Sequence, residues 1–159
     1  MPIPRERLRL SPEELDELCS SAHELHAATV SPDGMPHVVP LWFVWIGGEI
    51  WINNLRRSRR SRDIGAGSSV ALCVDTGELY TELRGAVFYG ELVEAADHDR
   101  LAEARAAFAA KYWGGTDVTG MKSHVWLRLE RARSVSWDFR KIPAGRDPRA
   151  DATGAAGNA

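Results

Sequence analysis

Residues 27–64 read AATVSPDGMPHVVPLWFVWIGGEIWINNLRRSRRSRDI, and this stretch decides the expected fold. Three apolar segments, at about 26–30, 36–46 and 49–55, are separated by Ser-Pro-Asp-Gly and by Gly-Gly, which are typical of tight turns. The stretch therefore predicts a β-meander of three strands. Five arginines follow the third strand within residues 56–62, so the meander brings a dense positive charge to one place.

The basic segment, residues 56–62, predicts an anion-binding site. Guanidinium groups bind phosphate oxygens through two parallel hydrogen bonds. We expect a short helix over about 58–66, whose first N–H groups would add to the attraction. The alternative is a solvated or salt-bridged face, which such a segment forms in most proteins. We favour the anion site because the arginines follow directly on a strand rich in Ile, Trp and Asn.

The remaining pattern indicates one domain over residues 1–142. The chain has 159 residues, of which 44% are hydrophobic and 26% charged, and this suits a single globular core. Ser11-Pro12-Glu13-Glu14 predicts a helix start with a capping box, and residues 98–113 predict a second amphipathic helix. Further strand patterns lie at 70–74, 82–95, 124–130 and 134–139. Residues 143–159 have almost no apolar bulk and predict a flexible tail.

Several classes of function are disfavoured. The net charge of −2 argues against general nucleic-acid binding, and no apolar run approaches the ~20 residues of a membrane helix. Cys19 and Cys73 lie far apart without a CxxC motif, and the N-terminus carries no signal-peptide pattern. We therefore expect a cytoplasmic protein with free thiols. None of the five histidines has the spacing of metal ligands, and no hydrolase motif is present.

Six segments, in this order and spacing, resemble a known family. They are ATVSPDGMPHVVPLWF, IWINNLRRSRRSRDI, VALCVD, ELRGAVFYGELVE, FAAKYWGG and SVSWDF, and together they span about residues 24–139. The sequence resembles the pyridoxamine 5′-phosphate oxidase-like superfamily, whose members bind FMN or the deazaflavin coenzyme (F-420), usually as homodimers. The resemblance implies a mainly β fold with a few helices, a six-stranded antiparallel split β-barrel.

The resemblance also implies where a cofactor would lie. Residues 40–42 would run alongside the ring, and the basic segment would hold the phosphate. The chain has one more residue in the turn before that segment than the family pattern, which leaves the register of Arg57 and Ser58 open. The implied cofactor-binding residues are Pro40, Leu41, Trp42, Ile52, Asn53, Arg57, Ser58, Arg59, Arg60 and Gly85.

Two departures from the family pattern bear on the cofactor and the substrate. Gly85 stands where FMN-dependent members place a cofactor-binding glutamine, and the additional arginines suit a more anionic cofactor. We therefore expect the deazaflavin coenzyme, with FMN as the alternative. The C-terminal KIPAGRDPRADATGAAGNA lacks the arginine and histidine segment that grips pyridoxamine phosphate in the vitamin oxidases, so pyridoxal phosphate synthesis is not expected.

The resemblance thus implies an oxidoreductase that transfers a hydride between a deazaflavin and a small-molecule organic acceptor. The alternatives are an FMN-dependent oxidase or reductase, and a flavin-binding protein without catalytic activity. The resemblance implies a homodimer with cofactor sites near the interface. Neither nucleic acid nor a membrane is expected as a partner.

Overall fold

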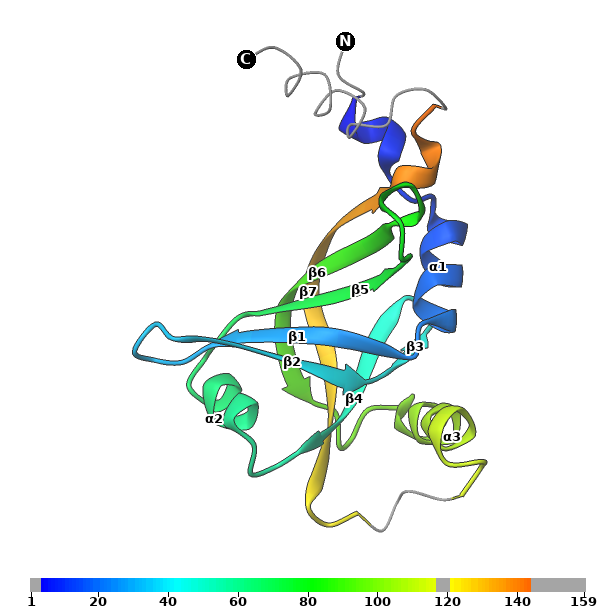
Figure 1. Cartoon of the computed structure of the whole chain (residues 1–159). Helices are drawn as coiled ribbons and strands as arrows, with labels where there is room; N and C mark the ends of the chain where they lie inside the picture. The colour runs from blue at the N-terminus through cyan, green and yellow to red at the C-terminus, as the bar shows by residue number, and fades with distance from the viewer. Residues whose placement is uncertain (1–3, 117–120, 144–159) are drawn as a thin grey trace.

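The computed structural model describes residues 4–116 and 121–143, which form one curled antiparallel sheet with helices around it (Figure 1). The expected tail lies outside the described residues, apart from Pro143. The strands are β1 (Glu24–Val30), β2 (Pro36–Trp42), β3 (Val44–Ile46), β4 (Glu49–Leu55), β5 (Val70–Thr76), β6 (Arg84–Glu94) and β7 (His124–Asp138). The α-helices are α1 (Pro12–Ser21), α2 (Arg59–Gly65) and α3 (Leu101–Tyr112), and the 3₁₀ turns are η1 (Arg5–Leu8), η2 (Tyr80–Glu82) and η3 (Phe139–Lys141).

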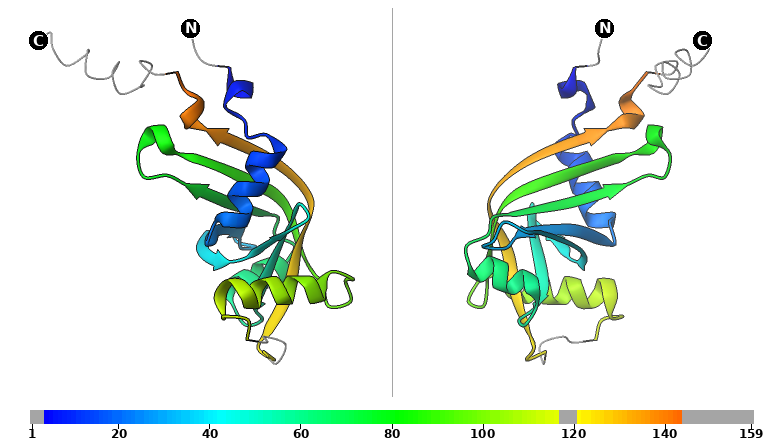
Figure 2. Two further views of the ribbon diagram at one scale, coloured as in Figure 1. Left: turned by 90° about the vertical axis from the view of Figure 1, so that its right-hand side faces the viewer. Right: turned by 60° about the vertical axis from the view of Figure 1, so that its left-hand side comes forward.

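The strand order within the described residues is β2-β1-β5-β6-β7-β4-β3. β2 and β3 are consecutive in the chain, yet they lie at opposite ends of this order. The sheet must therefore curl until its two ends approach each other, as both views in Figure 2 show. This curl is the geometry of a split barrel, so the expected fold class is confirmed.

The described sheet has seven strands, whereas the resemblance implied six, and residues 36–46 form two strands instead of the expected one. The interruption falls at Phe43, whose side chain is fully buried. The backbone N–H of Phe43 donates to the Tyr112 hydroxyl at 3.1 Å, and its carbonyl accepts from Lys111 Nζ at 3.1 Å. Side chains from α3 thus satisfy the backbone groups that a neighbouring strand would otherwise pair. The segments at 124–130 and 134–139, by contrast, join into the single strand β7.

Two apolar clusters hold the sheet in this shape. The inner cluster fills the barrel with residues such as Leu25, Ile52 and Leu72, together with Leu18 and Cys19 from α1. The outer cluster packs α3 against the other face of β3, β4 and β7. Its members are Val44, Ile46, Trp51, Ala95, Leu101, Ala104, Phe108 and Trp126. β4 therefore sends alternate side chains into different clusters, as the pleat of a strand requires.

The turns and caps follow the sequence expectation. Ser11 accepts from the backbone N–H of Glu14 at 3.2 Å, and the Glu14 carboxylate accepts from the backbone N–H of Ser11 at 2.7 Å, which is the predicted capping box. Gly47 and Gly48 both have positive φ and join β3 to β4 as the expected two-residue turn. Of the helices in the described ranges, none has the length and apolar character that a membrane crossing requires.

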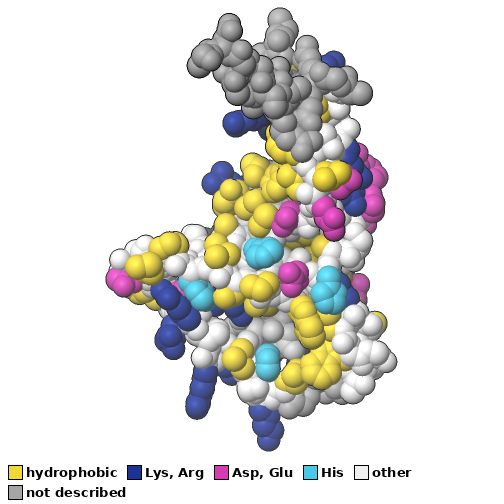
Figure 3. Space-filling view, in the orientation of Figure 1, with side chains coloured by type: hydrophobic (Ala, Val, Ile, Leu, Met, Phe, Trp, Pro, Cys, Tyr) yellow, Lys and Arg dark blue, Asp and Glu magenta, His cyan; other side chains and the backbone are white. Residues whose placement is uncertain are grey.

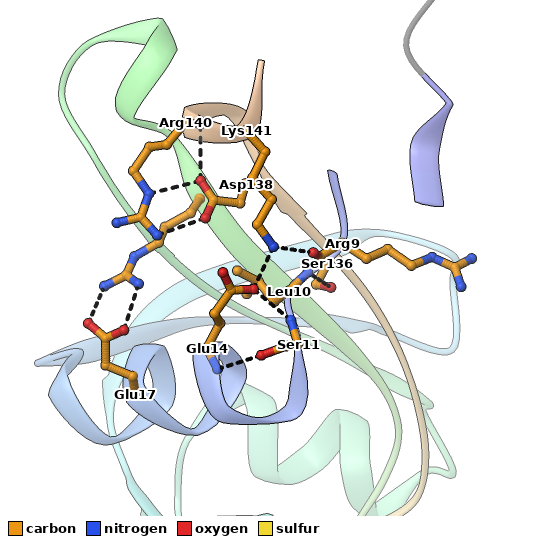
Figure 4. Close-up of polar contacts among 10 residues, drawn as sticks. Arg9, Leu10, Ser11, Glu14, Glu17, Ser136, Asp138, Arg140 and Lys141 are labelled. Atoms are coloured by element: carbon orange, nitrogen blue, oxygen red, sulfur yellow. Dashed lines mark hydrogen bonds and ion pairs between the residues drawn. The ribbon is translucent and has the colours of Figure 1, made fainter. Parts of the chain in front are cut away.

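Ion pairs fix α1 to the ends of β6 and β7 (Figure 4). Arg84 donates to both carboxylate oxygens of Glu17 at 3.1 and 3.3 Å, and Lys141 Nζ lies 2.5 Å from the Glu14 carboxylate. The buried Asp138 carboxylate accepts from Arg140 Nε at 2.9 Å and from Nη2 at 2.7 Å. The Arg140 side chain holds the pKa of Asp138 below its usual range.

Arg140→Met should lower the free energy of unfolding at pH 7 by about 1–3 kcal/mol, because it removes the side-chain donors of a buried carboxylate. The contact lowers the folded-state pKa of Asp138, so its stabilisation is present above the ordinary carboxyl pKa of about 3.9 and disappears as pH falls below it. Urea unfolding of both proteins from pH 7 downwards measures this. The exposed Lys122→Met is the control, and a gap that stays constant at low pH would contradict the assignment.

Candidate cofactor site

A pocket of ≈ 440 Å³ lies where the ends of β2 and β4 meet α2 and α3. Its volume is within the range of ligand sites in proteins. The lining residues are Glu24, Pro40, Leu41, Trp42, Asn53, Leu55, Arg60, Phe108, Trp113, Met121 and His124. The lining combines an apolar and aromatic wall with a few polar groups, which is the usual character of a site for a flat organic molecule.

Five of the ten residues expected at the site line this pocket, namely Pro40, Leu41, Trp42, Asn53 and Arg60. They come from β2, β4 and α2, and β2 is not paired to β4 in the sheet. The curl of the sheet is what brings them together. Pro40 lies on β2, at one end of the described strand order, and an edge strand suits a proline because proline has no backbone N–H to donate to a neighbouring strand.

Arg60, in the first turn of α2, is 6% exposed. Its Nε and Nη2 donate to the side-chain oxygen of Asn54 at 2.9 and 2.5 Å. Among the described residues, no carboxylate lies within ion-pairing distance of this guanidinium. Burial lowers the pKa of Arg60, which is the mark of a cation that its surroundings do not compensate. An anion in the pocket would compensate it.

Asn53 offers the pocket a second unsatisfied group. Its side-chain oxygen is buried and has no hydrogen-bond partner among the described residues. Within the described part of the chain its amide nitrogen donates to the thioether sulfur of Met121 alone, at 3.5 Å, and this sulfur is a weak acceptor. Buried amide groups are nearly always hydrogen-bonded in folded proteins. The Asn53 amide is therefore free to make directed hydrogen bonds with a bound molecule.

Ser58 and the other arginines take different positions from Arg60. The Ser58 hydroxyl accepts from the backbone N–H of Ser61 at 3.1 Å and so caps α2. Arg57 and Arg59 are exposed. Figure 3 shows Lys and Arg side chains extending from the lower left of the molecule, below the β1–β2 hairpin and around α2. α2 spans only the seven residues Arg59–Gly65, so the side chains rather than the helix terminus are the candidates for binding an anion.

Ile52 and Gly85 lie outside the pocket lining. Ile52 is 1% exposed and points into the inner cluster, because it alternates with Asn53 along β4. Gly85 lies on β6 opposite Trp137, and a Cβ atom there would come within 2.4 Å of the Trp137 ring. The glycine is thus required by the packing of Trp137. This gives a reason for Gly85 that does not involve a cofactor.

A family model described as pyridoxamine 5′-phosphate oxidase matches residues 11–137. The chain belongs to this family. The matched range runs from the cap of α1 to the last residue but one of β7, and it includes α1, α2, α3 and β1 to β6. The family contains FMN- and deazaflavin-binding split barrels, and the pocket described above lies entirely within the matched range.

Solved structures with the same fold belong to proteins of different function. A conserved hypothetical protein from Mycobacterium tuberculosis is 26% identical with a TM-score of 0.77, and the match covers 89% of this chain and 92% of that one. A protein titled F420 reductase is 22% identical over 79% of this chain and 98% of that one, with a TM-score of 0.57. The heme storage protein HutZ from Vibrio cholerae is 18% identical over 77% of this chain and 89% of that one, with a TM-score of 0.61. A comparison with curated protein sequences finds no significant match.

Six lining residues of this family member were not expected at the site from the sequence. They are Glu24, Leu55, Phe108, Trp113, Met121 and His124. His124 comes to the pocket because β4 and β7 pair with Leu55 opposite His124. Phe108 faces both the outer cluster and the pocket. Their positions depend on strand register and helix placement, and the FAAKYWGG segment was the one local signal that pointed to this region.

Proposed function

We propose that this chain is an oxidoreductase that binds the deazaflavin coenzyme in the pocket and exchanges a hydride between it and an organic acceptor. The observation that carries the proposal is Arg60, a buried cation bonded to a neutral amide and lining the pocket. A buried charge without a counter-ion is costly, and a phosphate group would supply the counter-ion.

The residues of the pocket fit such a cofactor. Arg60 would hold the phosphate, and the Asn53 amide would make a directed hydrogen bond. Pro40, Leu41 and Trp42 provide a wall for a flat ring. When bound, the deazaflavin supplies the hydride chemistry, while the protein binds, orients and excludes water.

The exposed arginines support the deazaflavin over FMN. Arg57, Arg59 and Arg62 are exposed beside the buried Arg60. A single phosphate needs two or three such partners, whereas the deazaflavin carries a longer anionic tail. An FMN-dependent enzyme is one alternative. A flavin-binding protein without catalytic activity is another, because proteins of this fold include a heme storage protein. Reduction of an acceptor by the loaded protein distinguishes an enzyme from a binding protein.

We further propose that a second copy of the chain covers the outer face of the sheet. One row of side chains crosses this face through Pro40, His26, Cys73, Val87 and Val135, which are successive cross-strand partners. Val38 lies two residues from Pro40 on the same face and is 63% exposed. Figure 3 shows hydrophobic side chains over the middle of the molecule. Exposed apolar surface of this kind, interrupted here by His26, is typical of protein interfaces.

Arg60→Ala should weaken deazaflavin binding by about 1.5–3 kcal/mol, the range for hydrogen bonds to a charged group. Arg60→Lys should recover part of the loss, because lysine binds phosphate as a point charge. Arg59→Ala, in the same helix but exposed, is the matched control and should cost clearly less. Isothermal titration of the three variants decides, with thermal melts to confirm folding. Equal affinity in the Arg60→Ala variant would mean that Arg60 does not face the phosphate.

The protein should bind the deazaflavin more tightly than FMN, and the preference should shrink as salt rises. The exposed arginines attract the anionic tail, and exposed charges are screened within about 10 Å at 0.1 M salt. Competitive titration of the two cofactors at low and high salt measures this. A variant with Arg57, Arg59 and Arg62 replaced by alanine should lose most of the salt dependence. Tighter FMN binding at both salt concentrations would favour the FMN alternative.

Light scattering at micromolar concentration should give the mass of a dimer. Val38→Arg should shift the mass toward that of a monomer, because it places a charge on the outer apolar face. Leu79→Arg is the control, because it also replaces an exposed apolar side chain by arginine but lies away from the row of side chains that crosses this face. It should leave the mass unchanged. A monomer mass for the unchanged protein would refute the proposed interface.

A further inference from the structure

Tyr112, the last residue of α3, ties together three separate parts of the chain. Its hydroxyl lies 2.6 Å from the backbone carbonyl of His23 and 2.8 Å from that of Phe43. The same hydroxyl accepts from the backbone N–H of Phe43 at 3.1 Å. Burial raises the pKa of Tyr112 to about 12, so the hydroxyl keeps its proton and donates it to one of these carbonyls. The α1–β1 junction, the β2–β3 junction and the end of α3 are thus held at one point.

Lys111 strengthens the same junction. Its Nζ donates to the Phe43 carbonyl at 3.1 Å and lies 4.4 Å from the centre of the Phe43 ring. It also lies 5.2 Å from the centre of the Tyr112 ring. A lysine over aromatic faces is attracted by their negative electrostatic potential. Consecutive side chains from α3 therefore fix the backbone of Phe43, directly after Trp42.

The Tyr112 ring supports the Trp42 ring. The two rings are parallel within 2°, with centroids 4.5 Å apart. Phe108 and His23 approach the Trp42 ring at tilted angles, with centroids 6.3 and 6.0 Å away. Trp42 lines the pocket and is 43% exposed, whereas Tyr112 is absent from the lining. The Tyr112 ring therefore covers one face of the Trp42 ring without itself lining the pocket.

We propose that Tyr112 is a positioning residue, which holds the Trp42 ring as a rigid wall for the flat ring of a bound molecule. This inference rests on the proposed function, since it assigns the ring-binding side of the same pocket. An unsupported tryptophan on an edge strand would rotate among several rotamers and would lose that freedom on binding. The stack with Tyr112 restricts those rotamers in advance, and such preorganisation increases affinity without any new contact to the ligand.

A double-mutant cycle tests whether Tyr112 acts through Trp42. Tyr112→Leu should weaken binding of the deazaflavin and of FMN about fivefold to tenfold, which corresponds to the loss of one aromatic stacking contact. Tyr112→Phe keeps the stacked ring, so its affinity should stay within about twofold of that of the unchanged protein. It removes the hydroxyl that bonds the backbone of Phe43, so its melting temperature should fall. In a Trp42→Leu background, Tyr112→Leu should cause no further loss, because the ring that it supports is already gone.

Tyr80→Leu is the control, because Tyr80 packs on Phe139 and is absent from the pocket lining, so affinity should not change. If the affinity losses of Tyr112→Leu and Trp42→Leu add in the double mutant, Tyr112 does not act through Trp42. That result would overturn the inference and leave the proposed function unaffected. A loss of affinity in Tyr112→Phe as large as that in Trp42→Leu would also overturn the inference. If Tyr112→Leu does not fold, the affinity of Tyr112→Phe provides the test. Failure of the unchanged protein to bind either cofactor would overturn the proposed function and the inference with it.

Discussion

The structure depends on how the backbone of Phe43 is satisfied. At this residue the chain leaves one end of the sheet and enters the other, so neither of its backbone polar groups has a partner in the described strands. A buried N–H or C=O without a partner costs free energy comparable to a lost hydrogen bond. The Tyr112 hydroxyl and the Lys111 ammonium supply the partners from α3. The curl of the sheet, and with it the pocket between β2 and β4, thus relies on a helix about 70 residues later in the sequence.

A cationic side chain, that of Arg60, stays buried beside the pocket. Arg60 is held in place by Asn54, and Asn54 in turn donates to Ser61 Oγ at 2.8 Å. These contacts fix the direction of the guanidinium but leave its charge without a carboxylate partner among the described residues. The protein therefore retains part of the desolvation cost of the charge in the unliganded state. A site that is already desolvated and oriented loses little on binding an anion, which is the advantage of such an arrangement.

Local sequence signals predicted the local structure of this chain well. The capping box at Ser11, the turn at Gly47–Gly48 and the short helix after the arginines are all present. Each depends on a few neighbouring residues, which the sequence shows directly. The split of residues 36–46 could not be predicted in this way, because it depends on Lys111 and Tyr112.

The candidate site was predictable only in part, for a related reason. The basic segment and the apolar strand were visible as patterns, but alternation along β4 decides that Asn53 faces the pocket and Ile52 the core. Which of the arginines is buried depends on the orientation of α2 against β4. His124 and Phe108 enter the pocket through strand register and helix packing, which a single sequence does not display. The expectation for Gly85 was based on alignment, and in the fold its partner is Trp137.

The amide of Asn54 has a consequence for how relatives of this protein could diverge. An aspartate has nearly the same shape as an asparagine, and it would place a permanent negative charge against the Arg60 guanidinium. The aspartate would then neutralise the Arg60 charge, which is the role proposed for the phosphate. The pocket would no longer attract an anion through this arginine. A one-nucleotide change in the codon could thus convert a cofactor-binding barrel into a self-neutralised scaffold with an unchanged fold. The residue at the position of Asn54 therefore separates related sequences that keep the proposed anion site from those in which an aspartate would neutralise the arginine.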